Sequence, residues 1–552
     1  MGKAVFIANA KYIRTTSGNV QDELDSIVAG GLPSQSGNQF KFLSTNGTNA
    51  QWTNGQIEVA TFAELEALEP EAEGLVFICQ ERKNAKYILQ NISYTALAGD
   101  VTFTNGRVGA LQQLNDPRFF GAKADGSTDD TAAVEACASR ADYVTCDESL
   151  TLLVGTVSIL SNQKFKDIRF KLADATNAEC LSCERNAVGC EFIRVTVDGN
   201  KLNNTGLCHG IRFNGSKDCK VIGCNIFNTL TNGISIFTGD ISNTNLEIRD
   251  NTVRACDWDS VEIRGSVGAK ITNNTFESWG AGHNAIELQE PHTDMVISGN
   301  TFIDDRGDLF AIESAGAPAR VDGFIISDNT FKGNYTGISG LFFKGVISNN
   351  SFVGGVATWR SGIELASEDI IVEGNWIDNG SISIASHGST VPVYNAKNVQ
   401  ILNNFVRNKG NDTKALYLGA AASATGTPTC TDIKISGNTF DFTEATGTAG
   451  RALQLGRYSL QSEIDGIDVT DNVILGNGST ASTRGIIVDC LAGSGKVTVK
   501  GNRISGFANN VNLPSDNLTR LILRNNDLED FINNAFLDSS TTTVVTNQDN
   551  DV

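Results

Sequence analysis

Four glutamates occupy the same position of a short strand-like pattern that recurs along the chain. The pattern alternates aliphatic and variable residues, as in SVEI (260–263), AIEL (285–288), AIES (311–314) and GIEL (362–365). Alternation with period two is typical of a β-strand that turns one face inward and the other outward. The outward position is occupied by Glu262, Glu287, Glu313 and Glu364.

Stacking of these strands would bring the carboxyl groups of neighbouring copies to about 5 Å from one another. Two full negative charges at that distance repel by roughly 3 kcal/mol at an effective dielectric of about 20, which raises the proton affinity of one partner. Hydrolysis of a glycosidic bond requires such a neutral acid beside a charged carboxylate, whether the carboxylate attacks the sugar or activates a water molecule. We therefore predict Glu287 and Glu313 as the catalytic pair, with Asp304, Asp305 and Asp308, on a loop that can fold over the groove, as rivals for the acid or base. Glu262 and Glu364 are predicted to bind substrate.

Aromatic, acidic and basic residues gather in the segments between the strands. Tryptophan rings stack on the apolar faces of sugars, and carboxylates or guanidinium groups hold hydroxyls and acidic substituents. We expect these segments to rim a saccharide groove along the glutamate column. The predicted substrate-binding residues in them are Asp257, Trp258, Asp259, Trp279, His283, Asp304, Arg306, Trp359 and Arg360.

A second recurring pattern, of which ISGNTF (297–302) is typical, indicates how the glutamates could be stacked. In nearly every copy the residue before the asparagine is Gly, Asn or Asp, which tolerate the left-handed backbone of a tight corner. Each copy therefore predicts strand, corner and strand. The corner asparagines could bond to the backbone and to one another in a ladder. They are Asn200, Asn225, Asn251, Asn274, Asn300, Asn329, Asn350, Asn375, Asn404, Asn438, Asn472, Asn502 and Asn526.

The copies are separated by 21 to 34 residues, a spacing typical of stacked repeats. Variable gaps at fixed points favour a right-handed parallel β-helix of about 13 or more coils over a propeller, whose blades need four strands in about 40–50 residues. A β-sandwich would show hairpin turns instead of one corner chemistry at constant phase. We predict a mainly β fold, with residues 146–530 as a β-helix that is catalytic and receptor-binding, and 531–552 as a C-terminal tail.

The residues before the repeat have a different composition. Residues 1–56 end in a segment rich in Gly, Ser, Asn and Thr, and we predict an extended attachment segment. Residues 57–110 are predicted to form a small α+β domain, in which Thr61 and Glu64 make a capping box for a short helix. Residues 111–145 contain an opening motif and a helix that Thr128 or Asp129 can cap, whose apolar side would close the end of the β-helix.

The composition disfavours several kinds of partner. The chain has 43 Lys and Arg against 63 Asp and Glu, a net charge of −20, which disfavours nucleic acid and anionic membranes. No stretch approaches the about 20 apolar residues of a membrane span, and MGKAVFIANAKYIR is too short and polar for a secretory signal. We expect no nucleic-acid partner and no membrane insertion.

The twelve cysteines are scattered, and we expect them to be reduced residues of the core. Cys180 and Cys183 form a C-x-x-C with Cys190 nearby, but no second C-x-x-C or His pair follows at the spacing of zinc ligands. We therefore predict neither a metal nor a cofactor.

The segment FGAKADGSTDDTAAVEA (120–136) resembles the opening motif of the pectate-lyase-like β-helix superfamily, and GLPSQSGNQFKFLSTNGTNAQW (31–52) resembles bacteriophage tailspike proteins. The resemblance covers the order of parts along nearly the whole chain, and its motifs mark architecture more than chemistry. It implies a homotrimer that binds and often cleaves a bacterial surface polysaccharide, a capsule or an O-antigen. It also implies a virion protein, assembled in the host cytoplasm, whose N-terminal region contacts the phage baseplate or other tail proteins.

Three functions remain open at this point. The glutamate column favours an endo-acting glycoside hydrolase, a polysaccharide depolymerase, over a non-catalytic receptor-binding fibre and over a lyase on the same fold. QEPH (289–292) is similar to a motif of polysaccharide epimerases, so His283 or His292 could be the base of a lyase. With four histidines in the chain, we rank elimination below hydrolysis and a buried or solvated structural histidine above both. The chain lacks the NTD, GHG and RIK motifs of secreted polygalacturonases, which disfavours a pectin substrate.

Overall fold

The computed structural model describes residues 41–45, 50–54, 56–71, 73–240, 242–304, 310–314, 319–333, 336–353, 362–386, 395–409, 414–420, 429–446, 450–457, 461–478, 483–513, 518–529, 534–538 and 544–548. Five predicted site residues lie outside these ranges: Asp305, Arg306, Asp308, Trp359 and Arg360. Contacts divide the chain into two compact units, Met1–Cys146 and Asp147–Val552.

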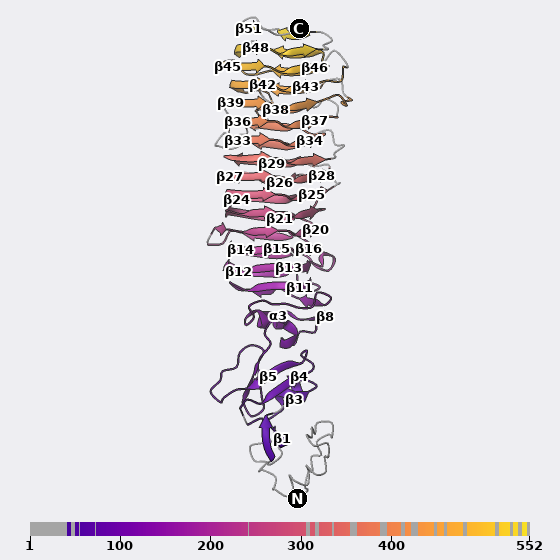
Figure 1. Ribbon diagram of the computed structural model, residues 1–552, viewed down its shortest axis with the longest axis vertical. Helices are drawn as coiled ribbons and strands as arrows, with labels where there is room; N and C mark the ends of the chain where they lie inside the picture. Colours follow the sequence, from indigo (N-terminus) through magenta and orange to yellow (C-terminus); the bar gives the residue numbers. More distant parts are fainter. Residues whose placement is uncertain are drawn as a thin grey trace. The chain divides into compact units, whose positions relative to one another are not determined.

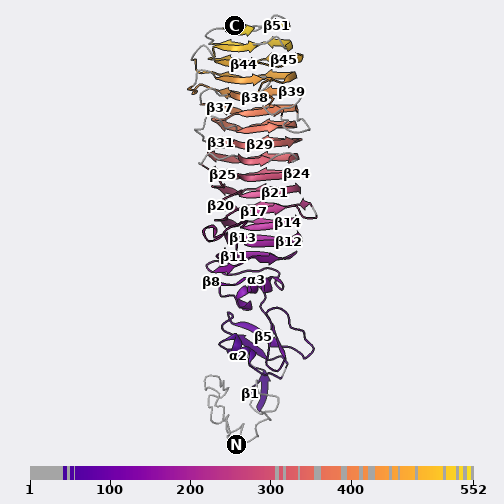
Figure 2. The ribbon, with the colours of Figure 1, turned by 180° about the vertical axis from the view of Figure 1, so that it is seen from behind.

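The second unit is a parallel β-helix, as the repeat predicts. Each strand pairs in parallel with the equivalent strand of the next coil, so that the strands form successive layers along the unit (Figure 1). The same layers are visible from behind (Figure 2). Inward positions of these strands are aliphatic or aromatic and almost fully buried. Burial of apolar surface between consecutive coils is therefore what holds the unit together.

The strands of the coils form three faces, named here by their position in the coil. The glutamate face consists of β10 (Val157–Ile159), β12 (Leu181–Val188), β14 (Ile211–Lys217), β17 (Ile234–Phe237), β21 (Val261–Val267), the start of β24 (Asn284–Ser298), β26 (Phe310–Ser314), β29 (Thr336–Phe343), β32 (Ile363–Ala366), β35 (Ile382–Ser386), β38 (Lys414–Ala420), β41 (Arg451–Leu455), β44 (Arg484–Val488), β47 (Asn509–Leu513) and β50 (Asn534–Asp538).

The second face consists of β9 (Thr151–Val154), β11 (Lys164–Leu172), β13 (Glu191–Asp198), β15 (Lys220–Ile222), β19 (Glu247–Arg249), β22 (Lys270–Thr272), the end of β24, β27 (Arg320–Ser327), β30 (Gly345–Ser348), β33 (Glu368–Glu373), β36 (Ala396–Leu402), β39 (Thr429–Ser436), β42 (Glu463–Thr470), β45 (Ser494–Lys500), β48 (Leu518–Arg524) and β51 (Val544–Gln548). A short strand, β18 (Asn243–Thr244), lies between the first two faces, and η3 (Lys201–Asn203) is a single 3₁₀ turn.

The third face consists of β16 (Asn225–Phe227), β20 (Thr252–Arg254), β23 (Thr275–Glu277), β25 (Thr301–Asp304), β28 (Thr330–Gly333), β31 (Ser351–Val353), β34 (Trp376–Asp378), β37 (Phe405–Arg407), β40 (Thr439–Asp441), β43 (Val473–Leu475), β46 (Arg503–Ser505) and β49 (Asp527–Glu529). Inside it, consecutive phenylalanines stack with ring centroids 5.3, 4.8 and 4.4 Å apart. These are Phe276, Phe302, Phe331 and Phe352.

An asparagine ladder runs along the corner between the second and third faces. In a typical rung, Asn350 Nδ2 donates to Asn375 Oδ1 at 2.9 Å and to the Ile326 carbonyl at 3.0 Å, and its backbone N–H also donates to Asn375 Oδ1 at 3.0 Å. The same bonds join each neighbouring pair from Asn251 to Asn526. The ladder satisfies buried polar groups that the corner would otherwise leave unpaired.

The residue before each ladder asparagine has a left-handed backbone, as predicted. Asp250, Gly299 and Asn349 are typical, with φ of 59°, 70° and 55°. Gly has no Cβ atom that would clash at such a φ, and the short side chains of Asn and Asp tolerate this backbone conformation.

The first two predicted members of the ladder are wrong. Asn225 pairs with Thr252 and Ile222 with Arg249, so the residue aligned with Asn251 is Cys224, whose backbone N–H donates to Asn251 Oδ1 at 2.7 Å. Asn200 lies beyond the corresponding strand, β13, and its Nδ2 donates to the Leu172 carbonyl at 2.9 Å. Asn200 and Asn225 match the repeated sequence pattern, but the strand pairing places neither of them at the corner position of the ladder.

The first unit contains a five-stranded sheet in the order β3-β4-β5-β7-β6. Its strands are β3 (Gln56–Val59), β4 (Val76–Cys79), β5 (Ala85–Leu89), β6 (Val101–Thr102) and β7 (Val108–Leu111), and β1 (Lys41–Thr45) with β2 (Ala50–Asn54) forms a separate antiparallel pair. The helix α2 (Phe62–Glu66) begins with the predicted capping box of Thr61 and Glu64.

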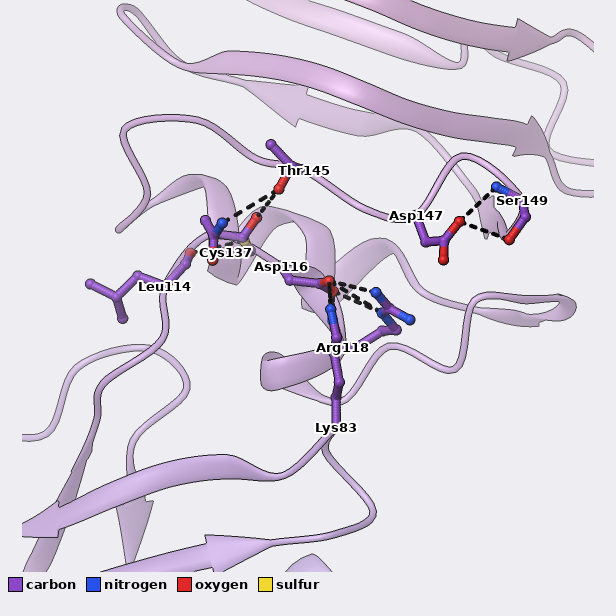
Figure 3. Close-up of polar contacts among 9 residues, drawn as sticks. Lys83, Leu114, Asp116, Arg118, Cys137, Thr145, Asp147 and Ser149 are labelled. Atoms are coloured by element: carbon purple, nitrogen blue, oxygen red, sulfur yellow. Dashed lines mark hydrogen bonds and ion pairs between the residues drawn. The ribbon is translucent and has the colours of Figure 1, made fainter.

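The segment after this sheet is organised by aspartates (Figure 3). Asp116 caps η2 (Pro117–Phe120) and pairs with Lys83 at 2.6 Å and Arg118 at 2.7 Å. After β8 (Asp125–Asp129), the helix α3 (Thr131–Ala138) begins. The N-cap of this helix is Asp130, which makes no side-chain cap bond, so the prediction of Thr128 or Asp129 as the cap is wrong. Asp129, one residue earlier, accepts the Thr131 N–H at 3.0 Å, and the Thr128 N–H donates to Asp125 Oδ1 at 2.7 Å. The prediction that this helix closes the β-helix stays a prediction.

All twelve cysteines are buried and free of disulfides, which confirms the prediction of reduced core cysteines. Burial raises the pKa of several of these thiols, Cys180 among them, far above the ordinary value, so they behave as apolar core atoms. Across the part of the chain that the structure describes, no helix is long and apolar enough to cross a membrane.

The asparagine ladder can be tested against an asparagine that only looks like a member of it. Asn350→Ala removes the acceptor of the Asn329 side chain and backbone N–H, and we expect a loss of about 3 kcal/mol of stability because buried donors are left unpaired. Denaturant unfolding followed by circular dichroism measures the loss. Asn225→Ala is the matched control, because Asn225 Oδ1 has no hydrogen-bond partner among the described residues. Equal losses in the two variants would contradict the ladder.

Candidate functional site

The strand register of the glutamate face aligns the outward residues in the predicted order. Glu262 pairs with Glu287, and Glu287 with Glu313, on consecutive coils. Glu364 is separated from Glu313 by Ser339. The whole column reads Arg212, Ser235, Glu262, Glu287, Glu313, Ser339, Glu364, Ser383, Tyr417 and Gln454.

A buried aliphatic residue next to each of Glu262, Glu287 and Glu313 holds the column in place. Ile263, Leu288 and Ile312 point into the core and are completely buried. Because side chains alternate along a strand, burial of these residues forces the glutamate next to each of them outward.

Three polar residues, each three positions before a column residue, form a second row that we call the polar staircase: Asn232, Asp259 and Asn284. All three are almost fully buried, with exposed fractions of 0%, 2% and 3%. The Asp259 N–H donates to Asn232 Oδ1 at 3.2 Å, and the Asn284 N–H donates to Asp259 Oδ1 at 2.7 Å. The staircase thus links three coils through side chain and backbone.

Each staircase side chain also contacts the glutamate of the following coil. Asn232 Nδ2 donates to Glu262 Oε2 at 2.5 Å, and Asn284 Nδ2 donates to Glu313 Oε2 at 2.7 Å. Between them, the Asp259 carboxyl is hydrogen-bonded to Glu287. Sequence reasoning missed this row, although an Asn or Asp recurring three positions before the column residue was a visible signal.

Two carboxyl groups of the site hold protons more tightly than usual. Burial, followed by the charge of Glu287 and the hydrogen bond to it, raises the pKa of Asp259 from 3.8 to about 9. Burial also raises the pKa of Glu313; the hydrogen bond from Asn284 opposes this rise, and the charge of Glu287 adds to it. Burial is the largest cause of both shifts, and the repulsion expected between neighbouring carboxylates is a smaller one.

Polar partners restrain Glu262 and Glu287. Arg264 Nε donates to Glu262 Oε1 at 2.8 Å, and Gln289 Nε2 donates to Glu287 Oε1 at 2.7 Å. The Arg264 guanidinium lies 4.2 Å from the centre of the Phe237 ring. Rigid donors of this kind hold carboxylates in one orientation, which catalysis needs.

Three of the predicted rim residues lie together and partly exposed. Trp258 is 38% exposed and stacks on His283, with ring centroids 5.3 Å apart and planes 12° from parallel. His283 Nδ1 lies 3.8 Å from Asp259 Oδ1, which brings the stacked pair next to the staircase. Asp257 is paired with Lys201 at 2.7 Å.

Two predicted rim residues lie elsewhere. Trp279 is completely buried, so the expectation that its indole borders a groove is wrong; folding removes this large apolar side chain from water. Asp304 is the last residue of β25 on the third face and is 2% exposed, so it is not the loop acid that the sequence predicted. The roles predicted for Asp305, Arg306, Asp308, Trp359 and Arg360 fall outside the described residues and stay predictions.

Two of the four histidines, His209 and His292, are buried. Burial lowers the pKa of both to about 4. Their burial agrees with the ranking of a structural histidine above a catalytic one, and the role of this pair stays a prediction. Within the described residues, no group of three or more His, Cys, Asp or Glu is arranged to hold a metal ion.

The model of the family described as "Right handed beta helix region" matches residues 158–282 and 259–440, together more than half of the chain. The chain belongs to the right-handed β-helix family. Membership gives the coils of this β-helix their hand, which agrees with the sequence prediction. No curated protein sequence matches the chain.

Among solved structures, this β-helix protein is similar to the enzymatically active domain of tailspike protein 2 of bacteriophage CBA120. The identity is 13% and the TM-score is 0.40, and the similarity covers 81% of this chain but only 57% of that chain. It is also similar to tailspike protein gp49 of Acinetobacter baumannii bacteriophage Fri1, a capsular polysaccharide depolymerase (14% identity, 74% and 76% covered, TM-score 0.44). A third similar structure is the A-module of a mannuronan C-5 epimerase of Azotobacter vinelandii. The identity is 14%, the similarity covers 78% of this chain and 100% of that chain, and the TM-score is 0.31. Such distant similarity carries no information on chemistry.

The raised pKa of Asp259 predicts a pH-dependent stability. The folded protein keeps this proton up to about pH 9, whereas the unfolded chain releases it near 3.8, so folding stability is lost as the pH rises between these values. Asp259→Asn removes the titration, and we expect its melting temperature to rise relative to the native protein as the pH is raised from 4 to 9. Differential scanning calorimetry measures the difference. Asp369→Asn, at an exposed corner, is the control, and the same trend in both variants would contradict the prediction.

Proposed function

We propose that this β-helix protein is a bacteriophage tailspike that binds a bacterial surface polysaccharide, a capsule or O-antigen, and hydrolyses its internal glycosidic bonds. The observation that carries the proposal is the stacking of Glu262, Glu287 and Glu313 in register on consecutive coils, with the buried Asp259, whose pKa is raised to about 9, hydrogen-bonded to Glu287. Glycoside hydrolysis uses that combination.

Glu287 and Glu313 are the proposed catalytic pair. One carboxyl group protonates the departing glycosidic oxygen, and the other attacks the sugar or activates water. Their coils are about 4.8 Å apart in the backbone, and both stereochemical courses stay open. Glu364 is proposed to bind sugar hydroxyls beside the cleaved bond. Glu262 is 4% exposed and is bound by Arg264 and Asn232, so the prediction that it contacts the sugar is wrong.

The partly exposed pair of Trp258 and His283 supports a saccharide ligand. A flat, apolar ring surface beside carboxylates suits a sugar, which has an apolar face and a rim of hydroxyls. Asp257, Arg306, Trp359 and Arg360 are proposed to complete the binding surface, and Asp305 and Asp308 stay rivals for the catalytic acid or base. Asp259 is 2% exposed, so the prediction that it contacts the sugar is wrong; it contacts Glu287 instead.

Two other functions are weaker. A lyase needs a base that touches the substrate, and His292 is completely buried. His283 is partly exposed but is stacked on Trp258, where a binding role suits it better. A non-catalytic receptor-binding fibre would use the same surface without cleavage, but it would have no need of proton-holding carboxyl groups, which lower stability.

Self-association, as a homotrimer, is part of the proposal. On the outward side of the second face, four aliphatic residues from consecutive coils form a column: Val296, Ile325, Val346 and Ile371. Ile325 is 47% exposed. A continuous aliphatic stripe on a water-facing sheet supports contact with another copy of the chain. The N-terminal region is proposed to attach the protein to the phage tail.

The hydrolase proposal predicts new reducing ends. On purified capsule or O-antigen from strains whose lawns the protein clears, we expect reducing-end release to fall by about 10²-fold or more in Glu287→Gln and in Glu313→Gln, because acid–base or nucleophilic chemistry is lost while sugar contacts persist. A reducing-sugar assay measures cleavage, and polysaccharide pull-down measures binding.

Glu368→Gln, on the second face, is the matched control and should leave cleavage unchanged. Binding without any release of fragments by the native protein would support the receptor-binding fibre. Fragments with the ultraviolet absorbance of an unsaturated sugar would support the lyase.

The aliphatic column predicts the association state. Ile325→Glu puts a charge in the middle of the column, and we expect the trimer to dissociate because a charge cannot be buried there without a partner. Sedimentation velocity measures the mass. Lys434→Glu lies in the same column of outward residues but in its polar part, and it should remain a trimer. A native protein that sediments as a monomer would contradict the proposed association.

A further inference from the structure

The polar staircase repeats one geometry three times with one change of chemistry. Asn232 and Asn284 each direct an amide N–H at the glutamate of the next coil. An amide proton forms a hydrogen bond but is not released at any ordinary pH. Glu262 and Glu313 therefore receive fixed donors.

At the middle position, the residue that contacts Glu287 is an aspartate. An ionised aspartate has no donor, so it would place two carboxylates against each other in a site where Asp259 is 2% exposed. Two buried like charges in contact are strongly unfavourable. The contact between Asp259 and Glu287 can be a hydrogen bond, like those from Asn232 and Asn284, only when Asp259 carries a proton and donates it to Glu287.

The groups around Asp259 favour the neutral acid. Its Oδ1 accepts the Asn284 N–H at 2.7 Å, which leaves the other oxygen to carry the proton. Glu287 and Glu262 both add negative charge nearby. Arg264 is bound to Glu262 at 2.8 Å and Lys201 to Asp257 at 2.7 Å, so these cations are engaged elsewhere.

His283, 3.8 Å from Asp259 Oδ1, is the other titratable group in contact, and it can pair with an ionised Asp259 only when it is itself protonated. Cys256, on the preceding segment, is fully buried, and its pKa is raised, chiefly by burial. It therefore brings no positive charge to the site. The raised pKa of Asp259 agrees with this arrangement.

We infer that Asp259 is a positioning residue that holds a proton against Glu287 and passes it to Glu287 during cleavage, which makes Glu287 the acid of the column and Glu313 its charged partner. The location of the proton rests on the staircase geometry. The role in cleavage rests on the proposed hydrolase function.

The proton balance of the step closes within the pair. Before cleavage, Asp259 and Glu287 together hold one proton. It moves from Asp259 to Glu287 and then to the glycosidic oxygen as the bond from that oxygen to the sugar carbon breaks. The pair is left with two adjacent negative charges. In the retaining course, the Glu313 carboxylate forms an ester bond to that carbon as the glycosidic bond breaks; water then displaces Glu313 from the carbon and gives one proton back to the pair. In the inverting course, the attacking water gives its proton to Glu313, Glu313 releases that proton to solvent, and the pair takes one proton from solvent.

An alternative assigns the acid to Glu313, whose pKa is also raised, chiefly by burial. In that case the contact between Asp259 and Glu287 would be structural only. Asp259→Asn separates the two assignments, because asparagine already occupies the equivalent positions before and after it and keeps the hydrogen bond to Glu287 without a transferable proton.

The position of the proton is measured by infrared spectroscopy on native protein labelled with ¹³C-aspartate. At neutral pH we expect an isotope-shifted carbonyl band of a protonated carboxylic acid, absent from Asp259→Asn and retained in Glu313→Gln. A native spectrum without this band, or a band that persists in Asp259→Asn, would overturn the inference. This measurement needs no substrate, so it stands even if no polysaccharide is cleaved.

The role in cleavage is measured by the pH profile of reducing-end release. We expect kcat of Asp259→Asn to fall by about 10²-fold with KM nearly unchanged, and the alkaline limb of its profile to move to lower pH. Asp369→Asn should behave like the native protein. Full activity of Asp259→Asn with an unchanged profile would overturn the proton-transfer role, whereas absence of cleavage by the native protein would overturn the hydrolase proposal instead.

Discussion

The parallel pairing of each strand with the equivalent strand of the next coil is the constraint on which the rest of the structure depends. Because the side-chain period of a strand is two, a slip of one residue would exchange every inward residue for an outward one. The buried aliphatic residues of the coils oppose such a slip, and the asparagine ladder opposes it again at the corner. Residues distant in the chain therefore become fixed neighbours.

The same constraint concentrates charge. Equivalent outward residues lie one coil apart, so a glutamate repeated in three coils becomes a row of interacting carboxylates. Such a row costs stability, and natural proteins retain such costs mainly where function requires them. The staircase moderates the cost with amide donors to Glu262 and Glu313 and with a protonated carboxyl group beside Glu287.

The coils separate the structural and chemical roles of the residues. Inward positions hold stacked phenylalanines and aliphatic side chains, which any coil of this kind needs. Outward positions are free to differ, and on the glutamate face they change from arginine through glutamate to tyrosine along the column. Ligand chemistry can therefore vary along the column without disturbing the core beneath it.

Much of this protein could be predicted from its sequence, because patterns of period two and repeated corners report local backbone geometry directly. The parallel β-helix, the left-handed corner residues, the capping box at Thr61 and the order of residues in the glutamate column all follow from such local signals. The register of the column was predictable because each glutamate lies next to an aliphatic residue that must be buried.

Only the tertiary structure decided which residues that match the repeated sequence pattern occupy equivalent positions in the coils, and which side chains are in contact. Asn225 matches the repeat but is one residue out of step with the ladder, because the pairing of strands in space, not the local letters, sets the register. Trp279 resembles a rim residue but is packed inside. The contact of Asp259 with Glu287 joins consecutive coils, and its proton depends on burial and on neighbouring charge. These quantities arise only when the coils are stacked and water is excluded between them.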